Sequence, residues 1–349
     1  MVSKTAIVLV LVVGLLGMVY QATQLPPPPP PPPPHSQSLN EAPVSVSSPR
    51  IRLSDGRYLA YREKGVPRNQ SYHTIIIVHG FGSSKDMTFI VPQELVQELG
   101  LYFLLYDRAG YGESDPNPTR TVKSESNDIL QLADQLQIGS KFYLIGVSMG
   151  SYPTWSCLKY IPHRLAGVAF IVPVINYQWP SLPENLISVD YRRKIVQWSL
   201  LIAKYAPGFL HWWATQKWFP STNFLERNSI LFNNRDIEVL KKTQGFEMLT
   251  KDRLRDRYVF DILRDDFLVG FGDWEFDPME LSNPFPDQNE SSVHIWQGYE
   301  DKVVPFQLQR YISRKLPWIK YHEVADGGHL IVHYDGLCES VLRALLVPV

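Results

Sequence analysis

Cysteine is scarce in this sequence, and the patterns that bind metals or nucleotides are missing. The 349 residues include two cysteines, Cys157 and Cys338, too few for a disulfide framework, and we expect both to be small buried hydrophobic residues. No Cys/His cluster has the spacing of metal ligands, and neither a P-loop nor a dinucleotide-binding fingerprint occurs. We therefore expect neither a metal nor a cofactor.

An excess of charge of one sign is also lacking. Lysine and arginine number 34 and aspartate and glutamate 35, so the formal net charge is −1. Nothing in this balance indicates nucleic acid or a strongly acidic molecule as a partner. The hydrophobic fraction of 44% is ordinary for a globular protein, and the length predicts one large domain or one domain with an insertion.

Charged residues are absent from residues 5–20, which read TAIVLVLVVGLLGMVY. As a helix this run extends over roughly 24 Å, and extension to Leu25 brings it near the ~30 Å of a bilayer's hydrocarbon core. We predict that residues 1–25 form a single-pass membrane anchor. A cleaved signal peptide, with its best cut after Ala22, is one alternative, and a peripheral hydrophobic tail is another.

The charges around this run predict its orientation. Lys4 and the N-terminus are positive, and the first charge after the run is Glu41. Because positively charged flanks stay in the cytosol, we expect the rest of the chain in the lumen of the secretory pathway or outside the cell. Cleavage of the segment would instead release a secreted protein.

Nine consecutive prolines, Pro26–Pro34, follow the apolar run. In the polyproline II conformation they form a stiff rod of roughly 28 Å. We interpret residues 26–48 as a stalk and linker, and a ligand for a proline-reading domain is the alternative.

From residue 49 onward, runs that predict strands alternate with stretches of helical period. The Asp55-Gly56 turn within Arg50–Gly65 predicts a β-hairpin. Continuous apolar runs then predict strands buried on both faces: His73–Gly80, Leu101–Gly112, Lys141–Gly146 and Leu165–Pro173. Amphipathic helices are expected between them, as at Ser124–Leu136 and Tyr152–Ile161. The alternation predicts a mostly parallel sheet that helices cover on both faces.

This alternation is interrupted once. Residues 179–286 contain helical patterns and many aromatic residues, among them Trp198, Trp212, Trp213, Trp218 and Trp274. These aromatic residues form either the core of the interrupting segment or the lining of an apolar pocket. The alternation resumes with two strands and a final helix, at Ser291–Gly298, Trp318–Val324 and near His333–Leu346.

The overall prediction is an α/β protein with a doubly wound, mostly parallel, eight-stranded sheet. Residues 49–178 and 287–349 form this core. Residues 179–286 form a helical cap inserted after the sixth strand.

Gly146-Val147-Ser148-Met149-Gly150 matches the nucleophile-elbow pattern Gly-x-Ser-x-Gly. It follows a predicted buried strand and opens a helical stretch, which is the context that the motif requires. We predict Ser148 as a nucleophile and the N–H of Met149 as an oxyanion donor. The N–H of Phe81, which follows the His79-Gly80 pair at a strand end, is the predicted second donor.

An activated serine needs a base, and the base needs an orienting acid. His329 lies in the loop ADGGH before the last helix, and we predict it as the base. Asp301 follows a predicted strand and is the predicted acid, with Glu300 and Asp326 as alternatives. The chain order Ser, Asp, His is the order expected of a nucleophile elbow on such a sheet.

Residues 50–349 resemble an α/β-hydrolase, and in particular membrane-anchored plant members of that family. The HG loop, the D-R-x-G-x-G-x-S turn, the G-x-S-M-G elbow, the G-x-x-D-x-x-V-P loop and the GGH loop occur in the family's order. We expect the D-R-x-G-x-G-x-S turn to hold structure rather than touch substrate. The resemblance implies that Ser148, His329 and Asp301 hydrolyse an ester, lipid, thioester or amide. Val147 replaces the His or Tyr often found in the elbow of lipases, which weakens the case for a lipid.

These observations predict a serine hydrolase that cleaves a small apolar or amphipathic carboxylic ester through an acyl-enzyme. The aromatic residues of the cap and the predicted anchor suggest that the substrate is met at or near a membrane. The alternative is a ligand-binding receptor or interaction protein on a hydrolase scaffold, because a fold does not fix a function.

Overall fold

The structure is a computed structural model that describes residues 48–215, 231–242, 247–285 and 292–347. The predicted anchor, residues 1–25, and the predicted stalk up to residue 47 lie outside the described residues, and so does Trp218. In the part of the chain that is described, no helix is both long and apolar enough to cross a membrane.

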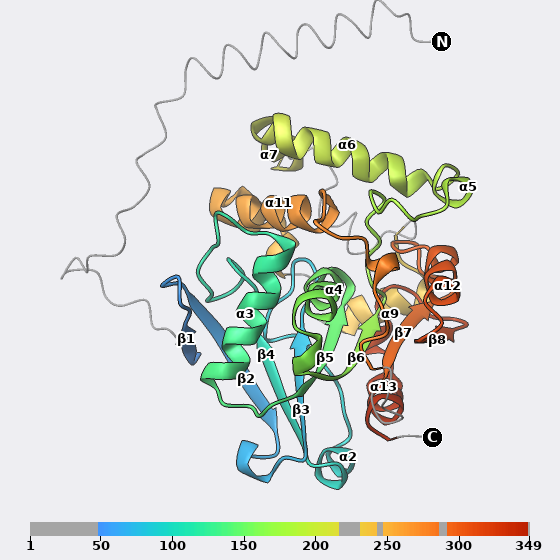
Figure 1. Cartoon of the computed structure of the whole chain (residues 1–349). Helices are drawn as coiled ribbons and strands as arrows, with labels where there is room; N and C mark the ends of the chain where they lie inside the picture. Colours follow the sequence, from blue (N-terminus) through green and yellow to red (C-terminus); the bar gives the residue numbers. More distant parts are fainter. Residues whose placement is uncertain (1–47, 216–230, 243–246, 286–291, 348–349) are drawn as a thin grey trace, which may run out of the picture. The chain divides into compact units, whose positions relative to one another are not determined.

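An eight-stranded sheet forms the centre of the protein (Figure 1). Its spatial order is β1-β2-β4-β3-β5-β6-β7-β8. The pairs β1–β2 and β2–β4 are antiparallel, and all other neighbours are parallel, so the predicted hairpin and mostly parallel sheet are confirmed. The strands are β1 (Arg50–Arg52), β2 (Tyr58–Gly65), β3 (His73–Val78), β4 (Leu101–Tyr106), β5 (Phe142–Val147), β6 (Leu165–Ile171), β7 (Val293–Gly298) and β8 (Ile319–Val324).

Helices cover both faces of this sheet. Those that follow the core strands are α2 (Gln93–Glu98), α3 (Val122–Gln135), α4 (Ser151–Tyr160), α12 (Phe306–Lys315) and α13 (Leu337–Leu346). Apolar side chains of α3, α4 and α12 pack in one cluster, and those of α2 and α13 pack in another cluster. Helix α3 begins with a capping box, in which the Thr121 side chain accepts from the N–H of Ser124 and the Ser124 hydroxyl accepts from the N–H of Thr121.

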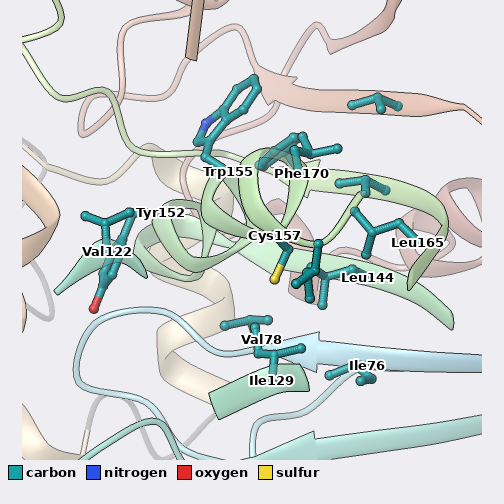
Figure 2. Close-up of a cluster of buried hydrophobic side chains, with 14 of the residues drawn as sticks. Ile76, Val78, Val122, Ile129, Leu144, Tyr152, Trp155, Cys157, Leu165 and Phe170 are labelled. Atoms are coloured by element: carbon teal, nitrogen blue, oxygen red, sulfur yellow. The ribbon is translucent and has the colours of Figure 1, made fainter. Parts of the chain in front are cut away.

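The central strands supply alternate side chains to the two clusters. In β3, Ile76 and Val78 belong to the cluster of α3 and α4, whereas Ile75 and Ile77 belong to the cluster of α2 and α13. This two-residue period on two buried faces explains why these strands read as continuous apolar runs. Figure 2 shows part of the first cluster, where the ring of Trp155 stacks on that of Phe170 at a centroid distance of 4.4 Å.

Both cysteines are free and buried, as expected. Cys157 lies in the cluster drawn in Figure 2. Cys338 lies in the cluster on the other side of the sheet, with its thiol directed at the carbonyl oxygen of Val332.

The described chain between β6 and β7, here called the helical insertion, contains α-helices and short 3₁₀-helices. Helix α11 crosses the end of the molecule at which the parallel strands finish, and α6 lies beyond it (Figure 1). The described residues from Ser48 onward belong to one compact unit with its own hydrophobic core. The α-helices of the insertion are α5 (Glu184–Ile187), α6 (Tyr191–Tyr205), α7 (Pro207–Thr215), α9 (Asn234–Lys242), α10 (Lys251–Arg255) and α11 (Arg257–Phe271).

The tryptophans of the insertion differ in their surroundings. Trp274 packs edge-on against Trp179 at 5.2 Å and belongs with the core. Trp198, Trp212 and Trp213 are 66%, 43% and 39% exposed. A large part of each of these three side chains is therefore exposed, which the sequence analysis did not anticipate.

The last helix begins later than predicted. A 3₁₀-helix occupies Ile331–His333, Tyr334 is extended, and α13 starts only at Leu337. Gly336 has a φ of 76°, a left-handed conformation that glycine adopts without strain and that separates the two helices.

Candidate active site

Ser148 occupies a strained turn between β5 and α4. Its φ is 50°, a value uncommon for a residue with a side chain, and it opens the 3₁₀-helix Ser148–Gly150. A Cβ atom on Gly146 would lie 2.3 Å from the hydroxyl oxygen of Thr154, and one on Gly150 would lie 2.2 Å from the carbonyl oxygen of Val78. The turn therefore requires both glycines of the motif, and it places Ser148 at the carboxyl edge of the sheet.

His329 and Asp301 meet Ser148 at this edge. The Ser148 hydroxyl lies 2.9 Å from Nε2 of His329, and Nδ1 of the same ring lies 2.9 Å from Oδ2 of Asp301. Because an ionised carboxylate can only accept, Nδ1–H donates to Asp301, which leaves Nε2 free to accept the serine proton. The structure thus brings together three residues that the sequence analysis singled out, from the loops after β5, β7 and β8.

Asp301 is held firmly in its loop. Its Oδ1 accepts hydrogen bonds from the N–H groups of Val303 and Val304, both at 2.8 Å. Oδ2 accepts from the side-chain amide of Gln297 at 3.0 Å as well as from His329. The four contacts fix the position of the carboxylate beside the imidazole.

The two alternative acids have other partners. The carboxylate of Glu300 accepts from the side-chain amide of Asn233, and that of Asp326 forms an exposed ion pair with Arg235. Asp301 is the acid whose carboxylate reaches the imidazole of His329.

A second carboxylate, Asp236, fixes the backbone of the histidine loop. Asp236 comes from helix α9 of the insertion and is fully buried. Its Oδ2 accepts from the N–H of His329 at 2.8 Å, and its Oδ1 accepts from the N–H of Leu330 and the hydroxyl of Tyr334, both at 2.9 Å. Asp236 therefore positions His329 without touching its ring.

The two carboxylates also act on the proton affinity of the imidazole. Burial alone lowers the pKa of His329, but the charge and hydrogen bond of Asp301 and the charge of Asp236 outweigh it. The net effect raises the pKa of His329 above its ordinary value of 6.5. The arrangement favours an imidazole that readily takes up a proton.

The loop after β3 lies directly against Ser148. A Cβ atom on Gly80 would lie 3.2 Å from Cβ of Ser148. The neighbouring His79 ring donates from Nδ1 to the carbonyl oxygen of Gly80 and accepts at Nε2 from the N–H of Arg108. Burial and the charge of Arg108 hold the pKa of His79 well below its ordinary range, so this histidine is neutral and structural.

Phe81 and Met149 are the predicted oxyanion donors. Phe81 directly follows Gly80, and its half-buried side chain packs between the core and the insertion. Met149 directly follows Ser148 and is 3% exposed. Their role as donors stays a prediction.

The Asp-Arg turn after β4 is structural, as expected. Asp107 is buried and accepts from the backbone and ammonium of Lys85 at 2.8 and 3.0 Å. The hydroxyl of Ser114 donates to the carbonyl oxygen of Asp107 and accepts from the N–H of Ala60. These bonds close the turn upon itself and upon β2.

Arg108 of the same turn joins the core to the insertion. Its guanidinium forms two hydrogen bonds with the carboxylate of Asp266 in α11, at 2.6 and 2.8 Å, and both side chains are fully buried. The hydroxyls of Tyr111 and Tyr152 donate to the same carboxylate, and Arg120 lies 3.0 Å from it. Burial raises the pKa of Asp266, but the charges of Arg108 and Arg120 outweigh it and hold the pKa below its ordinary value.

A cleft of about 900 Å³ opens beside these loops. Its wall includes Gly82, next to Phe81, and Leu330, next to His329. Charged side chains also line it, among them Lys85, Arg235 and Arg253. Among the described residues, no group of three or more His, Cys, Asp or Glu side chains is placed to hold a metal ion.

The sequence of the chain matches a model of the alpha/beta hydrolase fold over residues 73–335. The chain belongs to the α/β-hydrolase fold family.

Solved structures of this fold are similar over most of their length. An enol-lactonase from Burkholderia xenovorans LB400 has a TM-score of 0.60 at 16% identity, with 84% of this chain and 98% of that chain covered. A thermophilic esterase from Thermogutta terrifontis has a TM-score of 0.56 at 18% identity, with 85% and 98% covered. A bromoperoxidase from Bacillus anthracis has a TM-score of 0.58 at 20% identity, with the same coverage. At these identities the likeness concerns the fold, and a search of the curated proteins found no match.

Two residues of this α/β-hydrolase site escaped the sequence analysis. The sequence does contain a signal for the burial of Asp266. The residue lies on the buried stripe of α11, seven residues after Val259 and four before Gly270. A charge at such a position indicates a buried partner. Asp236 had no comparable signal, since an acidic residue near a helix start is common.

Proposed function

We propose that this α/β-hydrolase is a serine hydrolase that cleaves carboxylic esters. The observation that supports it is the pair of 2.9 Å contacts that links the Ser148 hydroxyl to His329 and His329 to Asp301. A serine on a strained turn at the carboxyl edge of the sheet, bonded to an oriented imidazole, is the arrangement that nucleophilic acyl transfer needs.

In the proposed reaction, Nε2 of His329 takes the hydroxyl proton as Oγ of Ser148 attacks the ester carbonyl carbon. The amides of Phe81 and Met149 donate to the oxygen of the tetrahedral intermediate. The imidazolium then protonates the departing alcohol, which leaves an acyl group on Ser148. Water, deprotonated by His329, attacks the acyl carbon. The bond from this carbon to Oγ of Ser148 then breaks, the imidazolium returns the proton to Oγ, and the acid leaves. Asp301 keeps Nδ1 protonated and stabilises the imidazolium in both halves.

The proposed substrate is an apolar or amphipathic ester. The apolar run at residues 5–20 supports it, since a membrane anchor would bring the candidate site close to amphipathic molecules. We further propose that residues 1–25 anchor the protein in a membrane of the secretory pathway, with the catalytic unit on the lumenal or outer side.

The deciding experiment is labelling of the full-length chain, in mild detergent, with a fluorophosphonate probe. We expect labelling of the wild type, none of Ser148→Ala, and very little of His329→Ala. Ser83→Ala, a serine in the wall of the neighbouring cleft, is the matched control and should label normally. Hydrolysis of esters of increasing acyl length then tests the substrate class.

Absence of labelling in a folded wild-type protein would contradict the proposal. A receptor on a hydrolase scaffold would then be the better explanation, and it would retain ligand binding in Ser148→Ala. Equal hydrolysis of short and long acyl esters would leave the hydrolase proposal standing and remove support for an apolar substrate.

A further inference from the structure

We propose that the outer face of helices α6 and α7 binds the surface of a phospholipid bilayer that contains anionic lipids. This surface, here called the α6–α7 face, is defined by eight exposed apolar and aromatic residues: Tyr191, Ile195, Trp198, Leu201, Tyr205, Phe209, Trp212 and Trp213.

The members on α6 form one continuous stripe. They follow one another at intervals of three or four residues, the spacing that places side chains on the same side of a helix. Trp198 is 66% exposed, Ile195 57% and Tyr205 73%. Large contiguous apolar areas are uncommon on soluble proteins and mark sites of interaction.

The stripe is not the face by which α6 joins the protein. Ala203 is buried, and Val196 packs against the main hydrophobic cluster, so the opposite side of the helix contacts the body of the molecule. A surface helix of a globular protein normally turns polar residues to water. Helix α6 instead turns Trp198 and its neighbours outward, which implies that something apolar covers them.

Helix α7, which follows α6 directly, adds three exposed aromatic residues. Phe209, Trp212 and Trp213 are between 39% and 43% exposed, and the rings of Phe209 and Trp212 lie 5.7 Å apart. Tryptophan and tyrosine are the residues enriched at the boundary between lipid headgroups and acyl chains, because one part of each ring system is apolar and another is polar.

The charges of the two helices favour a lipid partner over a protein one. Residues 191–215 contain no aspartate or glutamate, whereas Arg192, Arg193, Lys194 and Lys204 are basic. Arg192 and Arg193 pair with acids that precede α6, and Lys194 and Lys204 are exposed. Aromatic residues on one face of helices that carry basic but no acidic residues of their own are typical of helices that lie in the interface of anionic membranes.

The surface occupies a functionally suitable end of the molecule. Helices α6 and α7 lie beyond α11, at the end where the parallel strands finish (Figure 1). Ser148 lies at that same edge of the sheet, after β5. A bilayer bound by the α6–α7 face would therefore adjoin the end of the protein that carries the candidate active site. The proposal is nevertheless independent of the chemistry of Ser148, because binding to vesicles needs no turnover.

The test is cosedimentation of residues 48–349 with vesicles of phosphatidylcholine and phosphatidylserine in a 3:1 ratio. This fragment contains the complete described core and lacks the predicted anchor, which would itself enter the vesicles. We expect the wild type to sediment with them. The affinity of the double variant Ile195→Ser/Trp198→Ser for the vesicles should be at least about tenfold lower, since each substitution removes a large apolar side chain from the lipid contact.

Tyr72→Ser is the matched control, because Tyr72 is 82% exposed and precedes β3, at the opposite edge of the sheet from Ser148. Retained binding by this variant, together with loss in the double variant, would support the proposal. A folded wild type that stays in the supernatant would overturn it. Equal losses of binding in all variants would also overturn it. So would the finding that the wild type is a dimer, the double variant is a monomer and neither binds vesicles, since the face would then join two copies of the chain.

Discussion

Two regions of this protein act on the same histidine in different ways. The core supplies Asp301, whose carboxylate contacts the imidazole of His329, and the insertion supplies Asp236, whose carboxylate accepts from the backbone N–H. Both contacts are short, at 2.9 and 2.8 Å. The first selects the tautomer that reacts, and the second holds the loop that presents it.

The same division recurs at Asp266. This residue of the insertion forms its ion pair with Arg108 rather than with Ser148, His329 or Asp301. The backbone N–H of Arg108 in turn donates to His79, which precedes Gly80. The comparison suggests that the core carries the reacting groups and that the insertion, through buried carboxylates, fixes the loops that carry them. The α/β-hydrolase core and its insertion would then form one functional unit.

Replacement of the core carboxylate should have the largest effect on catalysis. In Asp301→Asn the amide group favours the imidazole tautomer that cannot accept the serine proton, and kcat should fall on the order of 10⁴-fold. Steady-state hydrolysis of an ester found in the substrate screen measures it. Glu300→Gln changes the neighbouring exposed acid and should behave like the wild type. Equal activity of Asp301→Asn and Glu300→Gln would show that Asp301 does not act on the imidazole.

Removal of the buried ion pair between core and insertion should have the next largest effect, on stability. Asp266→Ala leaves Arg108 and Arg120 buried beside a missing carboxylate, and the free energy of unfolding should fall by about 3 to 5 kcal/mol. Urea denaturation of residues 48–349 measures this. Asp265→Ala removes the adjacent, half-exposed acid and its partly buried ion pair with Arg264, and it should cost about 1 kcal/mol. A small loss in Asp266→Ala would mean that the insertion does not depend on this contact.

The insertion's other carboxylate should affect catalysis less than Asp301 does. Asp236→Asn places an N–H donor opposite the N–H of His329 or Leu330, which shifts the histidine loop. A displacement of this kind costs about 10²-fold in kcat/KM. Glu238→Gln, an exposed acid on the same helix, is the control. A loss as large as that of Asp301→Asn would contradict the division between positioning and reacting groups.

The smallest predicted effect is a change in pH dependence. Because the pKa of His329 is raised above 6.5, the neutral imidazole accumulates only at higher pH, and kcat/KM should rise through an apparent pKa above 6.5. Asp236→Asn removes a nearby negative charge and should move this limb to lower pH. If Asp236 acted only by holding the loop, Asp236→Asn would lower the rate and leave the apparent pKa unchanged. The pH profile therefore separates an electrostatic role of Asp236 from a purely structural one.

The sequence was informative where structure depends on neighbouring residues. Apolar runs predicted the buried strands, the Asp55-Gly56 pair predicted the hairpin, and the glycines of the elbow predicted the turn at Ser148. The start of the last helix was wrong by four residues, because the apolar period continues through Tyr334 and Gly336 although their backbone is not helical.

The sequence by itself determined the α/β-hydrolase core and singled out Ser148 and His329 as candidate nucleophile and base, since short motifs at strand ends specify them. Only the tertiary structure decided which of three candidate acids reaches the imidazole, that Asp236 and Asp266 come from the insertion, and that Trp198 faces outward. The reason is distance along the chain. Asp236 and His329 are 93 residues apart, and Arg108 and Asp266 are 158 apart. Such contacts arise from packing of whole helices against the sheet, which no local pattern encodes.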